Sequence, residues 1–298
     1  YEIHWRDWSS DVCSSDLDIF ALAVRSLGLR LRCNTERLAT VPKTGPLVVV
    51  ANHPFGVVDG LVLCHLVAQV RPDFKVVAMS TLCRVPEVRE HVLPINFANT
   101  REAIATSARS RAAARTHLRA GGCLVIFPAG GVSTAENVFG PAVDAPWHPF
   151  TGRLVQLGEA AVLPVRFAGQ NSRLFQLVSR FSPTLRLSLL MGEAHSRIGS
   201  EVRVQLGEVL PFDALAGFDD PKVLVEHLRQ VTHAIPLPPA GAGRLHRLRR
   251  VGGREGDGDD VGMADLADLV VPREGRDRPL ARRRFAVSVA VLPGRPRL

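Results

Sequence analysis

A histidine, a carboxylate and several backbone-bending residues are concentrated in one short stretch, Asn52-His53-Pro54-Phe55-Gly56-Val57-Val58-Asp59-Gly60. A histidine with one unprotonated ring nitrogen can take a proton from a hydroxyl, and a carboxylate at its other nitrogen fixes the tautomer and steadies the imidazolium. This makes His53 a candidate general base and Asp59 its supporting acid. The alternative is a histidine that only hydrogen-bonds its loop, with Asp59 serving as a helix N-cap.

A second polar turn, Phe127-Pro128-Ala129-Gly130-Gly131-Val132-Ser133-Thr134, follows another apolar run. Backbone N–H groups in such a turn form a concavity that accepts an anion, and Ser133 or Thr134 can add a hydroxyl donor. The alternative is a tight loop that needs glycine for a positive φ.

Both turns follow short apolar runs that alternate with helix-like stretches. Residues 47–51, 74–79, 92–96, 123–127 and 161–167 predict strands, whereas 61–70 and 101–119 predict helices. Residues 202–206 alternate at period two as an edge strand does, and 220–235 predict a closing amphipathic helix. This order predicts an α/β fold with a mixed central sheet covered by helices.

The two ends of the chain lack such patterns. Residues 1–17 contain Ser-Ser-Asp twice and no period, so we expect a non-native or disordered segment. Residues 238–298 are rich in Gly, Pro and Arg and predict a disordered tail. One domain is expected over 18–237. It opens with an amphipathic helix at residue 18 that either caps the core or lies in a membrane interface.

Composition narrows the range of functions. The formal net charge of +8 and 6% aromatic content show no basic, aromatic face of the kind that binds nucleic acid. The five cysteines have neither metal-ligand nor redox spacing, so we expect a reducing compartment and no metal. No apolar run approaches the ~20 residues that cross a bilayer. We therefore expect any membrane contact to be peripheral.

The order Asn-His-Pro-x-Gly-x-x-Asp-Gly followed by Phe-Pro-x-Gly-x-x-Ser resembles the glycerolipid and lysophospholipid acyltransferase superfamily, which includes the 1-acylglycerol-3-phosphate acyltransferases. The stretch Gly169-Gln170-Asn171-Ser172-Arg173-Leu174-Phe175 resembles the branch labelled hemolysin or ornithine-lipid acyltransferase. The resemblance covers roughly residues 27–237 and implies a glycerol-3-phosphate acyltransferase-like fold. It departs from the superfamily at Ala129 and Gly131, where glutamates are usual, and in the five residues between His53 and Asp59.

The resemblance also implies roles for individual residues. His53 would be the catalytic base and Asp59 its support. Arg101 would bind the acceptor's phosphate, although an ordinary first-turn residue of a solvated helix is the alternative. The remaining substrate-binding positions that the resemblance implies are Phe127, Pro128, Gly130, Gly131, Ser133 and Pro164.

The implied reaction is transfer of a fatty acyl group from acyl-CoA or acyl-carrier protein to the hydroxyl of a lysophospholipid or lyso-aminolipid. It needs no cofactor. The implied partners are a membrane lipid acceptor, the thioester donor and a membrane surface, with no nucleic acid. The implied location is the cytoplasmic face of a bacterial inner membrane, held peripherally. Two alternatives stay open: an inactive lipid-binding or scaffold homologue, and a thioester or lipid hydrolase.

Overall fold

The computed structural model describes residues 18–238 except 97, 99, 138–139 and 180–182. The segments predicted to be disordered, 1–17 and 238–298, lie outside the described residues apart from Pro238. No helix in the described part of the chain is long and apolar enough to cross a membrane.

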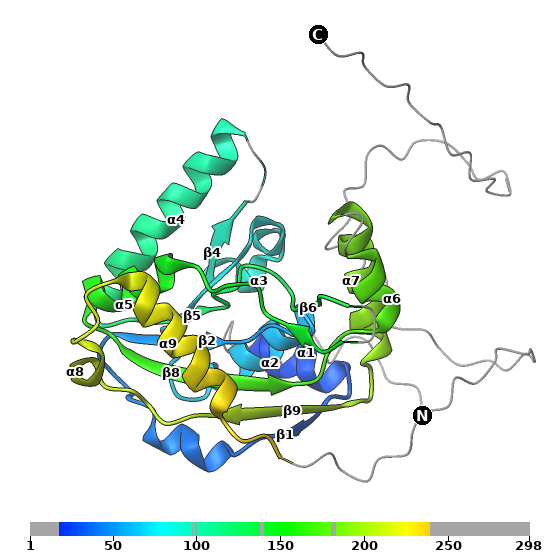
Figure 1. Ribbon diagram of the computed structural model, residues 1–298, viewed down its shortest axis with the longest axis horizontal. Coiled ribbons are helices and arrows are strands. Elements are labelled where there is room, and N and C mark those ends of the chain that lie inside the picture. Colours follow the sequence, from blue (N-terminus) through cyan, green and yellow to red (C-terminus); the bar gives the residue numbers. More distant parts are fainter. Residues whose placement is uncertain (1–17, 97, 99, 138–139, 180–182, 239–298) are drawn as a thin grey trace, which may run out of the picture. The chain divides into compact units, whose positions relative to one another are not determined.

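A seven-stranded sheet forms the centre of the fold, in the order β1-β9-β8-β2-β5-β3-β4 (Figure 1). Every neighbouring pair is parallel except β8 and β9. The predicted mixed α/β sheet is therefore confirmed. The strands are β1 (Arg30–Arg32), β2 (Leu47–Ala51), β3 (Lys75–Met79), β4 (Val92–Ile95), β5 (Cys123–Ile126), β8 (Ala161–Ala168) and β9 (Glu201–Leu206), and a separate two-stranded ribbon pairs β6 (Thr134–Ala135) with β7 (Ala142–Val143).

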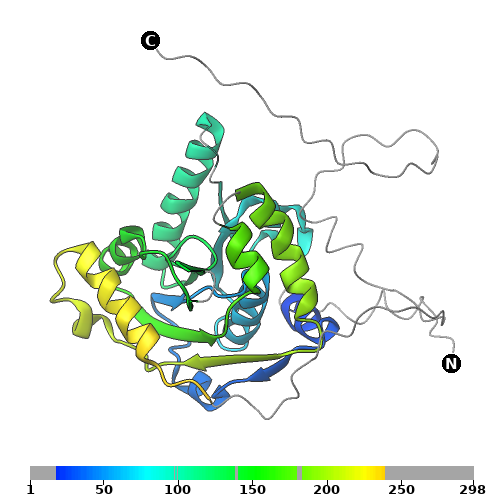
Figure 2. The same cartoon turned by 45° about the vertical axis from the view of Figure 1, so that its right-hand side comes forward.

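Helices cover both faces of the sheet (Figures 1 and 2). On one face, α4, α5 and α9 pack on alternate strand residues such as Val48, Val50 and Leu124. On the other face, α1 packs on α2, whose valines and leucines are almost all buried. The helices are α1 (Asp18–Ser26), α2 (Val57–Ala68), α3 (Pro86–Arg89), α4 (Arg101–Arg119), α5 (Pro149–Gly158), α6 (Arg173–Val178), α7 (Pro183–Ser196), α8 (Phe212–Leu215) and α9 (Pro221–Ala234), with 3-10 turns η2 (Thr35–Thr40) and η3 (Ser80–Arg84).

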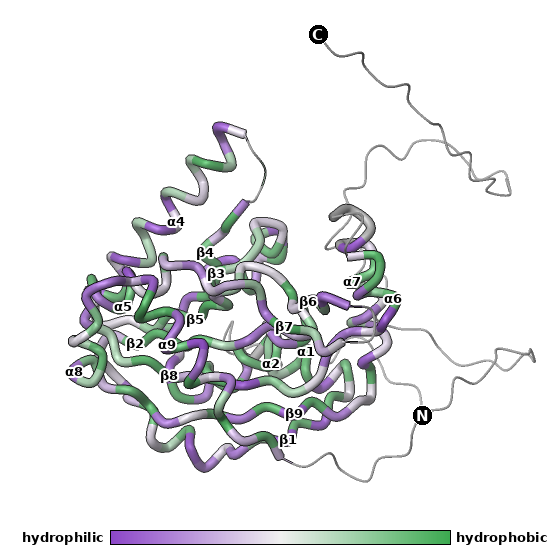
Figure 3. Tube along the Cα trace, in the orientation of Figure 1, coloured by the Kyte–Doolittle hydropathy of each residue, from purple (hydrophilic) through white to green (hydrophobic). Residues whose placement is uncertain are grey.

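The central strands are continuous apolar runs because both of their faces are covered. All five residues of β2 and all four of β5 are buried. Hydrophobic residues accordingly gather along the strands and α2, whereas α4 carries many hydrophilic ones (Figure 3). The strands that precede the two polar turns therefore lie side by side in the buried centre of the sheet.

A buried arginine holds together the N-terminal ends of β2 and β5, opposite the ends that carry the two polar turns. Arg71 is fully buried and donates to the carbonyls of Gly45, which precedes β2, and Gly121, which precedes β5, at 2.9 and 2.8 Å. Asp73 accepts two further bonds from the guanidinium at 2.8 Å. Because the planar guanidinium matches a carboxylate and several carbonyls at once, it holds β2 and β5 in register where they begin.

Two expectations from the sequence are corrected. Residues 202–206 do not form an edge strand, because β9 lies between β8 and β1, and the edge strands are β1 and β4. The helix expected over 61–70 begins at Val57, so Asp59 lies inside its first turn rather than before it. For α1 the core-capping alternative holds, since Phe20 and Val24 are only 5% and 6% exposed.

Candidate active site

The two polar turns meet at one edge of the sheet because they follow adjacent parallel strands. His53 comes two residues after β2 and Phe127 comes directly after β5. Asn52 anchors the first turn, since its side chain donates to Phe167 O at 2.9 Å and accepts from Phe167 N at 2.7 Å. This exchange continues the β2–β8 ladder past its last backbone pair and fixes the start of the histidine loop.

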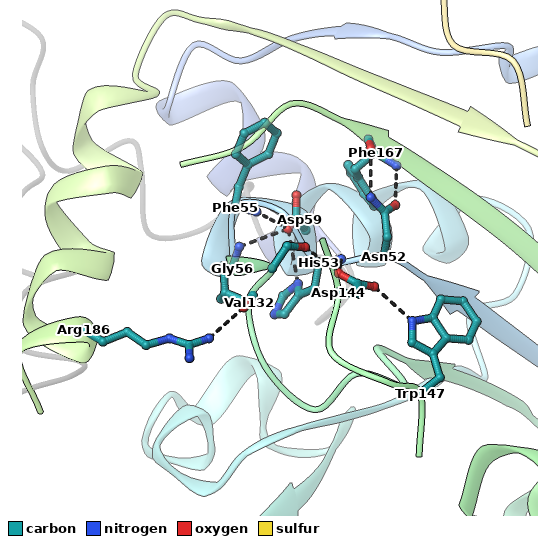
Figure 4. Close-up of polar contacts among 11 residues, drawn as sticks. Asn52, His53, Phe55, Gly56, Asp59, Val132, Asp144, Trp147, Phe167 and Arg186 are labelled. Atoms are coloured by element: carbon teal, nitrogen blue, oxygen red, sulfur yellow. Dashed lines mark hydrogen bonds and ion pairs between the residues drawn. The ribbon is translucent and has the colours of Figure 1, made fainter. Parts of the chain in front are cut away.

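The ring of His53 is held between the two turns (Figure 4). It stacks on the ring of Phe127 at 4.0 Å between centroids, and its side chain is 17% exposed. Nδ1 is buried and lies 3.2 Å from Asp59 Oδ2, without a regular hydrogen bond. Nε2 has no hydrogen-bond partner among the described residues and, unlike Nδ1, is not enclosed. An open Nε2 opposite a carboxylate-facing Nδ1 is the arrangement that a general base requires, and such contacts often tighten only with substrate bound.

Asp59 both caps the helix and faces the imidazole. Its Oδ2 accepts from the backbone N–H of Phe55 at 2.7 Å and of Gly56 at 3.0 Å, in addition to facing His53. The side chain is fully buried, and Oδ1 has no hydrogen-bond partner in the described structure. Burial raises the pKa of Asp59, opposed by His53 and by the two amides.

Gly56 is required at the turn into α2. Its φ is +84°, a region that residues with a Cβ rarely adopt. A Cβ there would also lie 2.8 Å from Leu190 Cδ1 of α7 and 3.1 Å from Val132 Cγ2 of the second turn. The histidine loop, the glycine turn and α7 are therefore packed against one another at this point.

Asp144 ties the histidine loop to the glycine turn, a role the sequence did not reveal. Its Oδ1 accepts from His53 N at 3.2 Å and from the hydroxyl of Ser133, and its Oδ2 accepts from Trp147 Nε1 at 3.0 Å. Ser133 N in turn donates to His53 O at 2.8 Å. The Ser133 hydroxyl thus supports the backbone of His53 through Asp144, and the substrate-binding role implied for Ser133 stays a prediction.

The glycine turn presents free backbone groups beside the histidine. Gly130 is exposed with a φ of +68°, and its N–H closes the turn onto Phe127 O at 3.0 Å. The N–H groups of Gly131 and Val132 donate to no described residue. Pro128 is buried, and its carbonyl accepts from His148 N at 2.9 Å. The turn thus offers two unpaired amides of the kind that stabilise an oxyanion.

Two arginines of the α7 region lie against this site and were not singled out from the sequence. Arg186 Nη2 donates to Val132 O at 2.7 Å (Figure 4). The Arg197 guanidinium lies 3.9 Å from the ring centre of Phe55, and its Nη2 donates to Gln170 O at 2.7 Å. The residues of α7 have no clear apolar period, so no sequence pattern predicted that these two arginines approach the site.

Two residues that the resemblance implied are not brought into contact with His53. Arg101 is the exposed first residue of α4, which follows β4 at the edge of the sheet, with β5 and β3 between β4 and β2. Pro164 is buried within β8 opposite Val50, and its carbonyl accepts from Gly207 N at 2.8 Å. The roles implied for them stay predictions, and neither lies among the contacts of the imidazole.

An imidazole with a buried carboxylate at one nitrogen and unpaired amides in the adjoining turn is an arrangement that can move a proton and stabilise an oxyanion at the edge of an α/β sheet. Within the described residues no cluster of metal-ligating side chains accompanies it. A family model described as Acyltransferase matches residues 18–236, and the chain belongs to that family. A comparison with curated proteins returns no match. The protein is therefore an acyltransferase.

Proposed function

We propose that the enzyme transfers a fatty acyl group from the thioester of acyl-CoA or acyl-carrier protein to a hydroxyl of a lysophospholipid or lyso-aminolipid. The observation that carries this proposal is the pairing of His53 with buried Asp59 beside an open Nε2. The motif resemblance to the lysophospholipid acyltransferases and the hemolysin or ornithine-lipid acyltransferase branch supports the choice of substrates.

In the proposed mechanism, His53 Nε2 takes the proton of the acceptor hydroxyl while Asp59 keeps the other nitrogen protonated. The acceptor oxygen attacks the thioester carbonyl carbon, and the resulting oxyanion lies near the free amides of Gly131 and Val132. The intermediate collapses with loss of the thiolate, which receives the proton from His53. Base catalysis of this kind contributes about 10²–10⁴-fold, and holding the two substrates together contributes further.

We also propose that the enzyme works at a membrane surface, on the cytoplasmic side of the inner membrane. The supporting observation is α6, where Leu174 and Leu177 are 60% and 40% exposed. Exposed leucines on a short helix suit an apolar interface. In α1 the side chains of Phe20 and Val24 do not serve this purpose, because they are buried in the core.

The test is an assay with a labelled acyl-CoA, a panel of lysolipids and wild-type protein beside His53→Ala. The proposal expects labelled lipid from wild type and almost none from the variant. Labelled free fatty acid without lipid product would instead indicate a hydrolase. Neither product, from protein that binds lysolipid, would indicate an inactive binding homologue.

A further inference from the structure

Arg186 is a half-buried arginine with no acidic partner among the described residues. Arg71 is paired with Asp73 at 2.8 Å, and Glu193 and Asp59 lie near enough to Arg197 to support its charge. For Arg186, burial lowers the pKa of the guanidinium, and no described carboxylate opposes that effect. A half-buried cation without a counter-charge is costly unless an anion accompanies it for part of the working cycle.

The guanidinium is aimed at the turn that faces His53. Its Nη2 donates to Val132 O at 2.7 Å, which is its only hydrogen bond to a described residue. The same nitrogen lies 3.4 Å from where a Cβ of Gly131 would stand, so the guanidinium lies close to the backbone of the glycine turn. Ser133, which follows Val132, donates its backbone N–H to the carbonyl of His53. Figure 4 shows Arg186 reaching from α7 toward this turn.

We propose that Arg186 binds a phosphate group of a substrate and holds it beside the glycine turn. A guanidinium has five donors in a planar fork that matches phosphate oxygens, and most of these donors lack protein partners here. The phosphate belongs either to the headgroup of the acceptor or to the donor, since coenzyme A and the carrier-protein arm both carry one. This inference rests on the proposed function for the identity of those substrates, but binding of phosphate by Arg186 does not require turnover.

The first test is therefore a melting experiment with inorganic phosphate against chloride at matched ionic strength. Wild type and Arg115→Gln, which removes an exposed arginine of α4, are expected to show a phosphate-specific rise in Tm. Arg186→Gln is expected to lose that rise. An equal rise in Arg186→Gln, or equal effects of phosphate and chloride on wild type, overturns the proposal.

A second pair of variants leaves Arg186 in place. Gly131→Asp puts a carboxylate against the guanidinium, and Gly131→Asn adds a side chain of the same size without the charge. We expect Gly131→Asp to lose the phosphate-specific rise in Tm. We expect Gly131→Asn to keep a clearly larger rise than Gly131→Asp. Equal effects of the two substitutions contradict a charge-based site and would reduce the turn to a steric role.

The source of the phosphate is then assigned by repeating the melts with coenzyme A and with glycerol phosphate. Stabilisation by one of the two that depends on Arg186 assigns the site to the donor or to the acceptor headgroup. In the transfer assay, Arg186→Gln should raise the KM of that substrate about 10- to 100-fold, as expected for loss of a charged hydrogen-bonded pair. Binding that survives in Arg186→Gln with both probes overturns the proposal. A failed acyl-transfer assay with intact phosphate binding would instead count against the proposed function alone.

Discussion

The substitution Asp59→Asn separates the two tasks of this carboxylate. Asparagine keeps one side-chain oxygen to accept from the backbone N–H of Phe55 and Gly56, which Asp59 Oδ2 now does at 2.7 and 3.0 Å. It removes the negative charge that lies 3.2 Å from His53 Nδ1. We expect kcat to fall by about 10²–10⁴-fold, the size of a general-base contribution, because the imidazolium loses its support.

The same substitution should not lower stability at neutral pH. Burial raises the pKa of Asp59, so the folded protein binds this proton more tightly than the unfolded chain does. The stabilisation from the bound proton is complete below the unfolded-state pKa and is lost as pH rises through the raised folded-state pKa. Above that pH the wild type buries an ionised carboxylate with Oδ1 unpaired, whereas the asparagine variant does not. The variant should therefore melt no lower than wild type, and its advantage should grow as pH rises from the unfolded-state pKa of Asp59 to its raised folded-state pKa and then level off.

Asp59→Ala is the matched control for the capping task. It leaves the N–H groups of Phe55 and Gly56 without an acceptor, at about 1–3 kcal/mol each. For a domain of this size each kcal/mol lowers Tm by about 2–4 °C. The assay is kcat and acceptor KM at saturating thioester, beside calorimetric melts from acid to alkaline pH. An Asp59→Asn variant that melts as low as Asp59→Ala while keeping its kcat would refute the reasoning, because Asp59 would then be only a helix cap.

Three further predictions follow from contacts around the site and from the chain's organisation. Ser133→Ala removes one hydrogen bond to Asp144 and should lower kcat by no more than about tenfold with an unchanged acceptor KM; a raised KM in steady-state kinetics would show direct substrate contact instead. Arg71→Met should lower the free energy of unfolding by at least about 3 kcal/mol in urea titrations, because the carbonyls of Gly45 and Gly121 and the carboxylate of Asp73 lose their partner. A loss under about 1 kcal/mol would contradict the role of Arg71 in holding β2 and β5 together. Deleting 239–298 should leave the melt cooperative and the activity intact, since the family match ends at 236, and aggregation or loss of activity would count against this boundary.

The strands that carry the His53 and Phe127 turns could be predicted from the sequence. Apolar runs before His53 and Phe127 indicated buried strands, and buried parallel strands end at a common edge. Their adjacency as β2 and β5 then brings the imidazole onto the Phe127 ring. Helix α4 was predicted with its observed bounds, since Gly121-Gly122 ends its pattern, and the structure adds that the Thr100 side chain caps its start by accepting from Ala103 N.

Period-two patterning misled the assignment of the edge strand for a physical reason. In β9 alternate residues are buried, because one face packs on the core and the other is only partly covered. Alternation therefore reports how the faces are covered, not whether the strand's own hydrogen-bonding edges are paired. The edge strand next to β9 is β1, which has three residues and is too short to show a pattern.

The missed site residues depend on contacts between distant segments. Asp144 lies 91 residues from His53 in a loop without a period, and only the fold shows that it accepts from the histidine's backbone. Arg186 lies 54 residues from the Val132 carbonyl that it binds. A single charged side chain on a helix or in a loop is by default a solvated one, so neither residue could be told from its neighbours before the chain is folded.

The role of His53 as general base is tested most directly by measuring kcat for acyl transfer in His53→Ala at saturating thioester and lysolipid. Calorimetry on the same sample establishes that the variant is folded. We expect a fall of about 10²-fold or more with a melting temperature close to that of wild type. Transfer to lipid at a wild-type rate by the folded variant would contradict the mechanism.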